Sequence, residues 1–302
     1  MPTFFRILDD KILTAGIVDQ LGFREDEGLR IPDEYLERGK FIIMRLAFGF
    51  GDWGIISAMP RLLKMKYPNC KVLIPSPKKV KSMFLGEGLD QWSHWPEPEA
   101  NPLLVFQNNP YVDGITDNLE GEIFHDHYRI WNTKEKKQPM IEQMLKFWQF
   151  TDKELKESLP ELYYSEDEIS FGNDIINKVF GDKPFGGLIL STSQLDKGKF
   201  YGGDIDKKTH EILQEYKDLP FCFYSGVNIK DTPFNYINVP LDFNEHKIPI
   251  RVQCYIREKA IVNLGYQSSI YDIIAGKTKI ICTSETMPGE NGENLSRSIK
   301  YI

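Results

Sequence analysis

The sequence has few of the residues that tie small secreted folds together. Its 302 residues include only four cysteines, Cys70, Cys222, Cys254 and Cys282, and these are scattered singly. Three of them stand in apolar runs, which is typical of buried, reduced thiols. Because no Cys-x-x-Cys pair occurs, a structural zinc site is disfavoured. We therefore expect free, buried cysteines in a reducing, cytoplasmic environment.

Long apolar runs and charge of one sign are also missing. No stretch approaches the roughly 18 apolar residues that a membrane span needs, which leaves only peripheral membrane contact open. The first residues lack the basic-then-apolar pattern of a secretory signal. The net charge of −7 is spread over the whole chain without a basic arm or stripe, and this disfavours a protein that grips nucleic acid.

What the sequence does contain is an alternation of short apolar runs with amphipathic segments. Strands are predicted at 40–47, 71–75, 102–106, 111–115, 122–130, 187–190, 221–224, 260–264 and 279–282. Helices are predicted at about 55–67 and at 138–150, 165–180, 204–217, 248–259 and 268–275. Such alternation indicates an α/β protein with two open, mostly parallel sheets, which bind ligands at the carboxyl ends of their strands.

We divide the chain into an N-terminal domain at 1–165 and a C-terminal domain at 166–302. Residues 1–38 are weakly patterned and are expected to form an extension or hairpin on the first domain. Two local signals mark helix starts. Ser165-Glu-Asp-Glu168 is a capping box, and Pro60 either kinks the first helix or opens its regular part as a first-turn proline.

A glycine-rich turn, Gly49-x-Gly51-x-x-Gly54, follows the first predicted strand and precedes a helix. This arrangement matches the dinucleotide fingerprint, in which a helix start faces a pyrophosphate. That fingerprint also expects an acidic residue at the end of the second strand. Here the strand ends in Ile74-Pro-Ser-Pro77, so an NAD(P)-dependent oxidoreductase is kept only as an alternative.

Four segments, in this order, resemble the heptosyltransferase-like proteins of glycosyltransferase family 9. They are Phe50–Pro60 with Lys66-Tyr-Pro68, Asn109–Ile115, Leu190–Lys197 and Gly265–Ala275. The resemblance implies a GT-B fold, with two Rossmann-like domains facing across a cleft. It also implies transfer of a sugar from a nucleotide sugar to a hydroxyl acceptor such as a lipopolysaccharide, with no further cofactor.

On the acceptor side, the resemblance and the chemistry both indicate Asp52, in the turn with Gly51 and Gly54. Sugar transfer with inversion needs a base that takes the proton of the acceptor hydroxyl, and a carboxylate at a strand end suits that role. The alternative is that Asp52 only caps the following helix.

On the donor side, the resemblance indicates Thr192, Ser193 and Lys197 after one strand and Gln267, Ser268 and Ser269 after another. Lys197 offers a point charge to the leaving diphosphate, and the hydroxyls add hydrogen bonds. Ser268 and Ser269 begin a helix, so their amides favour an anion. A solvated loop and ordinary helix capping are the structural alternatives for these residues.

The chain departs from the family pattern at Gln267, Ser269 and Asp272, where the family has Asp, Gly and His. A changed donor and an inactive, binding-only relative both stay open for this reason. His125 and His127 point to one side of a predicted strand, but no third ligand stands near them and no Asp-x-Asp element occurs. We therefore expect no metal.

Overall fold

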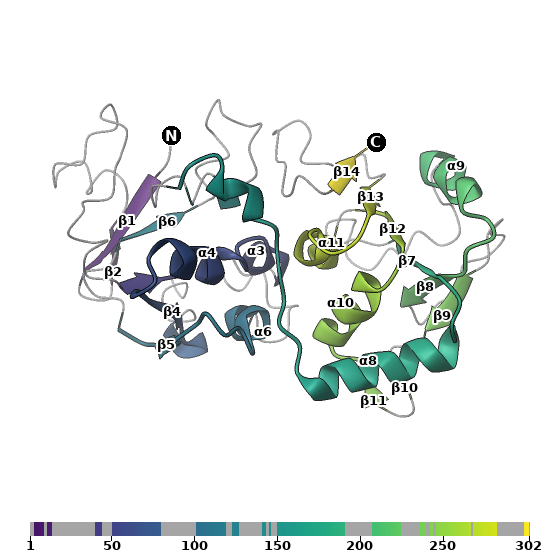
Figure 1. The fold of residues 1–302 in the computed structure, drawn as a ribbon, viewed down its shortest axis with the longest axis horizontal. Helices are drawn as coiled ribbons and strands as arrows, with labels where there is room; N and C mark the ends of the chain where they lie inside the picture. Colours follow the sequence, from purple (N-terminus) through teal and green to yellow (C-terminus); the bar gives the residue numbers. More distant parts are fainter. Residues whose placement is uncertain are drawn as a thin grey trace. The chain divides into compact units, whose positions relative to one another are not determined.

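The computed structural model describes residues 3–8, 11–13, 40–43, 50–79, 101–118, 123–126, 141–142, 145, 150–190, 207–224, 236–239, 242–243, 246–266, 268–282 and 299–301. The chain divides into two compact units, with the change at Tyr163 and Tyr164 (Figure 1). Each unit contains a parallel sheet with helices in its crossovers, so the α/β class with parallel sheets is confirmed. The roles assigned to the two predicted domains stay predictions.

The sheet of the first unit has three parallel strands in the order β3-β4-β5. Their bounds are Lys40–Ile42 for β3, Lys71–Pro75 for β4 and Gly114–Thr116 for β5. Helices α3, Phe50–Gly54, and α4, Met59–Lys66, connect β3 to β4. Helix α6, Asn101–Phe106, lies in the connection from β4 to β5.

Helix α4 settles the two interpretations of Pro60. The helix begins at Met59 and carries Pro60 in its first turn, where a missing N–H costs nothing and the fixed φ suits the helix. Met59, Leu62 and Leu63 are buried, whereas Lys64 and Lys66 stand in the last turn, where they complement the helix dipole. The first-turn interpretation is confirmed.

Residues 3–8 and 11–13 form a hairpin, and the rest of the predicted extension at 1–38 lies outside the described residues. Strand β1, Thr3–Leu8, pairs antiparallel with β2, Lys11–Leu13. The other side of β1 pairs with β6, Ile123–Asp126. The hairpin thus joins a three-stranded antiparallel sheet of its own.

One strand prediction in this unit is wrong. Residues 102–106 form α6 rather than a strand, because a short apolar run suits a buried helix as well as a buried strand. Pro102 stands in the first helical turn, where its ring favours helical φ. The next strand begins at Gly114 rather than Tyr111, since Asn108 has φ 60° and Asn109 Oδ1 accepts a hydrogen bond from Tyr111 N at 2.9 Å.

The second unit contains a six-stranded sheet whose neighbouring strands are all parallel. In chain order, the strands are β7 (Gly186–Ile189), β8 (Phe221–Tyr224), β9 (Tyr236–Val239), β12 (Val262–Gly265), β13 (Ile280–Cys282) and β14 (Ile299–Tyr301). The helices are α8 (Glu166–Val179), α9 (Lys207–Glu215), α10 (Ile250–Glu258) and α11 (Ser269–Ile274). A short hairpin of β10, Asp242–Phe243, and β11, His246–Lys247, precedes α10.

The strand order of this sheet, β14-β13-β12-β7-β8-β9, is the doubly wound order. Numbered one to six along the chain and read from β9, the strands run 3-2-1-4-5-6, as in dinucleotide-binding domains. The chain first builds outward from β7 to β9 and then from β12 to β14. The winding direction therefore reverses between β7 and β12.

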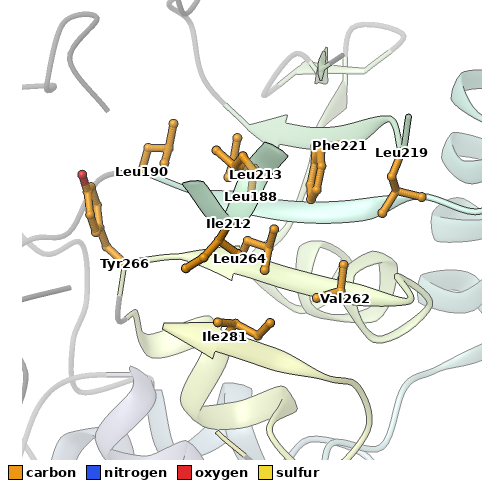
Figure 2. Close-up of a cluster of buried hydrophobic side chains, with 10 residues drawn as sticks. All are labelled: Leu188, Leu190, Ile212, Leu213, Leu219, Phe221, Val262, Leu264, Tyr266 and Ile281. Atoms are coloured by element: carbon orange, nitrogen blue, oxygen red, sulfur yellow. The ribbon is translucent and has the colours of Figure 1, made fainter. Parts of the chain in front are cut away.

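Two apolar clusters involve opposite sides of this sheet. Figure 2 shows the first, in which Ile212 and Leu213 of α9 pack with Leu188, Val262 and Leu264. The second joins α8 and α10, which pack side by side (Figure 1), with Cys222 of β8. In β8 the neighbouring residues Phe221 and Cys222 belong to different clusters, as the period of two in a strand requires.

Helix α8 starts at the predicted capping box. Ser165 Oγ accepts from Glu168 N at 3.1 Å, and Glu168 Oε2 accepts from Ser165 N at 2.8 Å. Glu168 also binds Arg251 of α10, with 2.6 Å between Nε and Oε1 and 3.1 Å between Nη2 and Oε2. The capping box is confirmed, as are four buried free cysteines.

Candidate functional site

The carboxyl ends of β7 and β12 lie side by side at the point where the winding reverses. Gly265 is the register partner of Ile189, and Tyr266 N donates to Ile189 O at 2.8 Å. Figure 2 shows Leu190 and Tyr266 at this end of the apolar cluster. In doubly wound sheets, ligands bind outside the carboxyl ends of strands at this reversal.

Gly265 makes the close approach of the two strands feasible. Its φ is +119°, and a Cβ built on it would lie 1.9 Å from Ile189 O. Side chains other than hydrogen are excluded there by both the backbone angle and the space. The chain thus turns out of β12 directly beside the end of β7.

Ser268 follows this turn as the N-cap of α11. Its backbone is extended, with φ −151° and ψ 158°, but its side chain makes no capping hydrogen bond. Its Oγ is buried and has no hydrogen-bond partner within the described part of the chain. Capping therefore does not account for the hydroxyl, which is left able to bind a ligand. Ser269 is the first residue of the helix.

A buried polar network lies beneath the carboxyl ends of β7 and β12, and it was not predicted from the sequence. Arg257 Nη2 donates to Leu188 O at 3.0 Å, and Asn263 Nδ2 donates to Arg257 O at 3.0 Å. The hydroxyl of Tyr271 donates to Leu264 O. Burial raises the pKa of Tyr271 well above its ordinary value, so the phenol stays a neutral donor. An asparagine inside the apolar run 260–264 was the one signal for this network.

The polar network needs a glycine in the neighbouring strand. A Cβ at Gly187 would lie 1.9 Å from Asn263 Oδ1 and 2.9 Å from Arg257 Nη1. The side chains of Asn263 and Arg257 therefore fill the space over β7 that a larger residue would take.

The expected glycine turn of the first unit has a different form. Gly51, Asp52 and Gly54 belong to the short helix α3, and among the described glycines only Gly181 and Gly265 have positive φ. Trp53, which lies between Gly51 and Gly54 in α3, is fully buried. Its ring stands edge-on to that of Phe106, with 6.5 Å between the ring centroids. Within the predicted glycine-rich turn at 49–54, residues 50–54 are therefore helical, with the buried Trp53 packed into the core. The side chain of Asp52 is outside the described structure.

Several predicted donor residues also lie outside the described residues: Thr192, Ser193, Lys197 and Gln267. Thr192 follows the end of β7 closely in the sequence, and Gln267 stands between Tyr266 and Ser268. Their roles stay predictions. Among the residues that the structure describes, no three His, Cys, Asp or Glu side chains gather in a way that could hold a metal ion. Within the same ranges, no helix has the length and apolar character needed to cross a membrane.

Comparison with known proteins gives a match in structure only. No family model and no curated protein matches the sequence. The solved structure of a family 9 glycosyl transferase from Veillonella parvula matches with a TM-score of 0.51 and 8% identity, over 91% of this chain and 86% of that one. The fold is thus similar to that of this family 9 glycosyl transferase. The resemblance seen in the sequence is thereby confirmed for the fold.

Two E. coli structures are similar at lower scores. The ADP-heptose lipopolysaccharide heptosyltransferase II gives a TM-score of 0.44 and 13% identity, covering 87% of this chain and 89% of that one. The heptosyltransferase WaaC with ADP gives a TM-score of 0.40 and 8% identity, covering 87% of this chain and 92% of that one.

Proposed function

We propose that this chain is an inverting, metal-independent glycosyltransferase. The second unit binds a nucleotide-diphosphate sugar, and the first unit binds the hydroxyl acceptor and supplies Asp52 as the base. A bacterial surface glycan such as a lipopolysaccharide is the acceptor class that the family fold suggests.

One observation carries the proposal. The residues assigned to the donor fall into two groups, Thr192–Lys197 and Gln267–Ser269, which follow β7 and β12 in the sequence. These two strands flank the reversal of the doubly wound sheet, where such sheets bind nucleotides. The buried, unpartnered Oγ of Ser268 adds support, since buried polar groups normally find a hydrogen-bond partner.

The proposed reaction is a single displacement at the anomeric carbon. The acceptor oxygen forms a bond to that carbon while the bond to the diphosphate oxygen breaks, which inverts the configuration. The proton of the acceptor hydroxyl passes to the Asp52 carboxylate. The nucleoside diphosphate leaves as an anion that Lys197 stabilises by charge and Ser268 by a hydrogen bond.

The oxidoreductase alternative fits the structure less well. Its glycine motif stands in the first unit, where Gly51 and Gly54 are helical without positive φ. The dinucleotide-type strand order belongs instead to the second unit. A binding-only relative would bind the nucleotide sugar without transferring the sugar. Measurement of sugar transfer therefore distinguishes it from an active glycosyltransferase.

Thermal unfolding with a panel of nucleoside diphosphates, nucleotide sugars and NAD(P) tests the proposal. A ligand at 100 times its dissociation constant stabilises the folded state by about 2.7 kcal/mol. We expect a clear shift with one nucleoside diphosphate and its sugar, and slow release of the diphosphate in EDTA. Stabilisation by NAD(P) alone would favour the oxidoreductase, and activity restored only by added magnesium or manganese would contradict metal independence.

A further inference from the structure

We propose that Asp117, oriented by Ser76, binds hydroxyl groups of the acceptor glycan at the carboxyl edge of the first unit's sheet. The inference rests on the proposed function, because it assumes that the acceptor is a carbohydrate. It assigns a second acceptor contact, separate from the base at Asp52.

Ser76 and Asp117 are neighbours because the two strands end in register. Pro75 of β4 pairs with Thr116 of β5, and Ser76 N donates to Thr116 O at 3.0 Å. Each residue therefore stands one position beyond the carboxyl end of its strand. This is the edge of an open α/β sheet at which ligands bind.

The Ser76 hydroxyl holds the carboxylate in place. It donates to Asp117 Oδ1 and accepts a hydrogen bond from Lys79 N at 3.0 Å. With its proton committed to Asp117, the serine acts as a positioning residue. Among the described residues, Ser76 is the only one that hydrogen-bonds to the Asp117 carboxylate, so Oδ2 stays able to accept from a ligand.

The loop after β5 is also held locally. Thr116 Oγ1 accepts from Asn118 N at 3.1 Å and donates to Asn118 O at 3.2 Å. Asp117 stands between these two residues and is exposed. A carboxylate held in one orientation loses little freedom when it binds, which favours affinity.

A second aspartate, at the other end of β5, shows what a purely structural role looks like. Asp113 precedes β5, and its Oδ2 accepts from Val72 N and from Lys64 Nζ, each at 2.6 Å. Burial would raise the pKa of Asp113, but these hydrogen bonds outweigh it and lower the pKa. Asp113 is thus bound within the fold at the amino end of β5, whereas Asp117 has no ion pair among the described residues.

The strand order of the first unit indicates which part of the acceptor Asp117 contacts. Strand β5 lies two places from β3 in the sheet, which is roughly 10 Å at the usual spacing between strands. Asp52 belongs to the connection after β3, so we expect Asp117 to lie further along the edge than the base. We therefore assign it to a neighbouring sugar of the acceptor, where a carboxylate accepts from adjacent hydroxyls.

A glycan array probed with the full chain, multimerised to gain avidity, tests this assignment. We expect the wild-type chain to retain a group of related glycans and Asp117→Ala to lower that signal at least tenfold. Ser76→Ala should lower it a few fold, and Ser76→Thr, which keeps the hydroxyl, should restore it. Asp113→Asn is the matched control: it should lower the unfolding temperature and leave the glycan pattern unchanged.

The outcomes separate this inference from the proposed function. If nucleotides stabilise the chain but no glycan is retained, or Asp117→Ala keeps the full signal, the inference is wrong and the donor assignment stands. If glycans bind through Asp117 but no nucleotide stabilises the chain, Asp117 is a glycan contact but not an acceptor contact, and the transferase proposal fails. A loss of glycan signal in Asp113→Asn equal to that in Asp117→Ala would also overturn the inference.

Discussion

A comparison of two glycines in the second unit tests the geometry of the proposed donor edge. Gly181 and Gly265 both have positive φ, at +60° and +119°. A Cβ at Gly181 would meet nothing within 4 Å, whereas a Cβ at Gly265 would lie 1.9 Å from Ile189 O. Alanine at the two positions therefore separates the cost of the backbone angle from the cost of crowding.

The expected magnitudes follow from these distances. Gly181→Ala should lower the free energy of unfolding by about 1 kcal/mol, the usual cost of a left-handed L-residue. At Gly265 the positive φ of +119° also strains an L-residue, and to this is added an overlap that only a shift of β7 or β12 relieves. Overpacking of this kind costs a further 1–3 kcal/mol or so, which gives a total of about 3 kcal/mol for Gly265→Ala.

Urea unfolding followed by circular dichroism measures the loss of stability, and calorimetric titration measures nucleoside diphosphate affinity. We expect Gly265→Ala to lose both stability and affinity, because the ends of β7 and β12 must move apart. Gly181→Ala should keep wild-type affinity. Equal losses of stability in the two variants, or wild-type affinity in folded Gly265→Ala, would refute the close approach as a determinant of the site.

Four further variants test charge, hydrogen bonding and proton transfer. Asp52→Asn should lower turnover by about 10²–10⁴ with unchanged donor affinity, and normal turnover would exclude Asp52 as the base. Lys197→Ala should weaken calorimetric diphosphate binding by about 1.5–3 kcal/mol, with a smaller effect at high salt. Ser268→Ala should cost less affinity and no stability, so equal affinity losses would place the phosphate elsewhere. Glu168→Gln should destabilise the chain by about 3 kcal/mol at pH 7, because it removes the carboxylate charge that pairs with the buried Arg251 guanidinium. Burial alone would raise the pKa of Glu168. The hydrogen bonds from Arg251 and Ser165 have the larger effect, so the pKa lies below its ordinary value of 4.5. The contribution of Glu168 is therefore complete above about pH 4.5 and lost as the pH falls through the lowered value. Unfolding curves of the wild type and Glu168→Gln should converge at low pH, and a constant gap would contradict this.

Local signals predicted the elements of the second unit well. The capping box gave the start of α8, and the run 221–224 matches β8 residue for residue. Helices α9 and α10 and strand β12 fall within the predicted segments or shift by one or two residues. Amphipathic period and caps act over a few residues, so a single sequence reveals them.

Elements that depend on packing against residues distant in the sequence were predicted less well. The run 102–106 is apolar enough for a strand but packs as α6, with Phe106 against Trp53 of α3. The same packing turns the glycine segment around Asp52 into helix. Strands β9 and β14 were not predicted, although their pairing with β8 and β13 completes the sheet. The order of strands in a sheet depends on contacts between residues far apart in the sequence, so a single sequence does not reveal it. This order located the reversal of the winding direction between β7 and β12.

The buried polar groups beneath this reversal explain how the edge can be ready for a ligand before one binds. Arg257 binds Leu188 O and Tyr271 binds Leu264 O, so each of the two central strands is held near its carboxyl end by a side chain from a helix. A polar network in the core contributes less to stability than apolar packing of the same volume, but it fixes one arrangement of the backbone. For a site built from loops after β7 and β12, this fixed arrangement is what matters, since ligand affinity rises when the binding groups are already in place. Asn263 and Arg257 are therefore better understood as supports of the proposed donor edge than as core residues selected for stability.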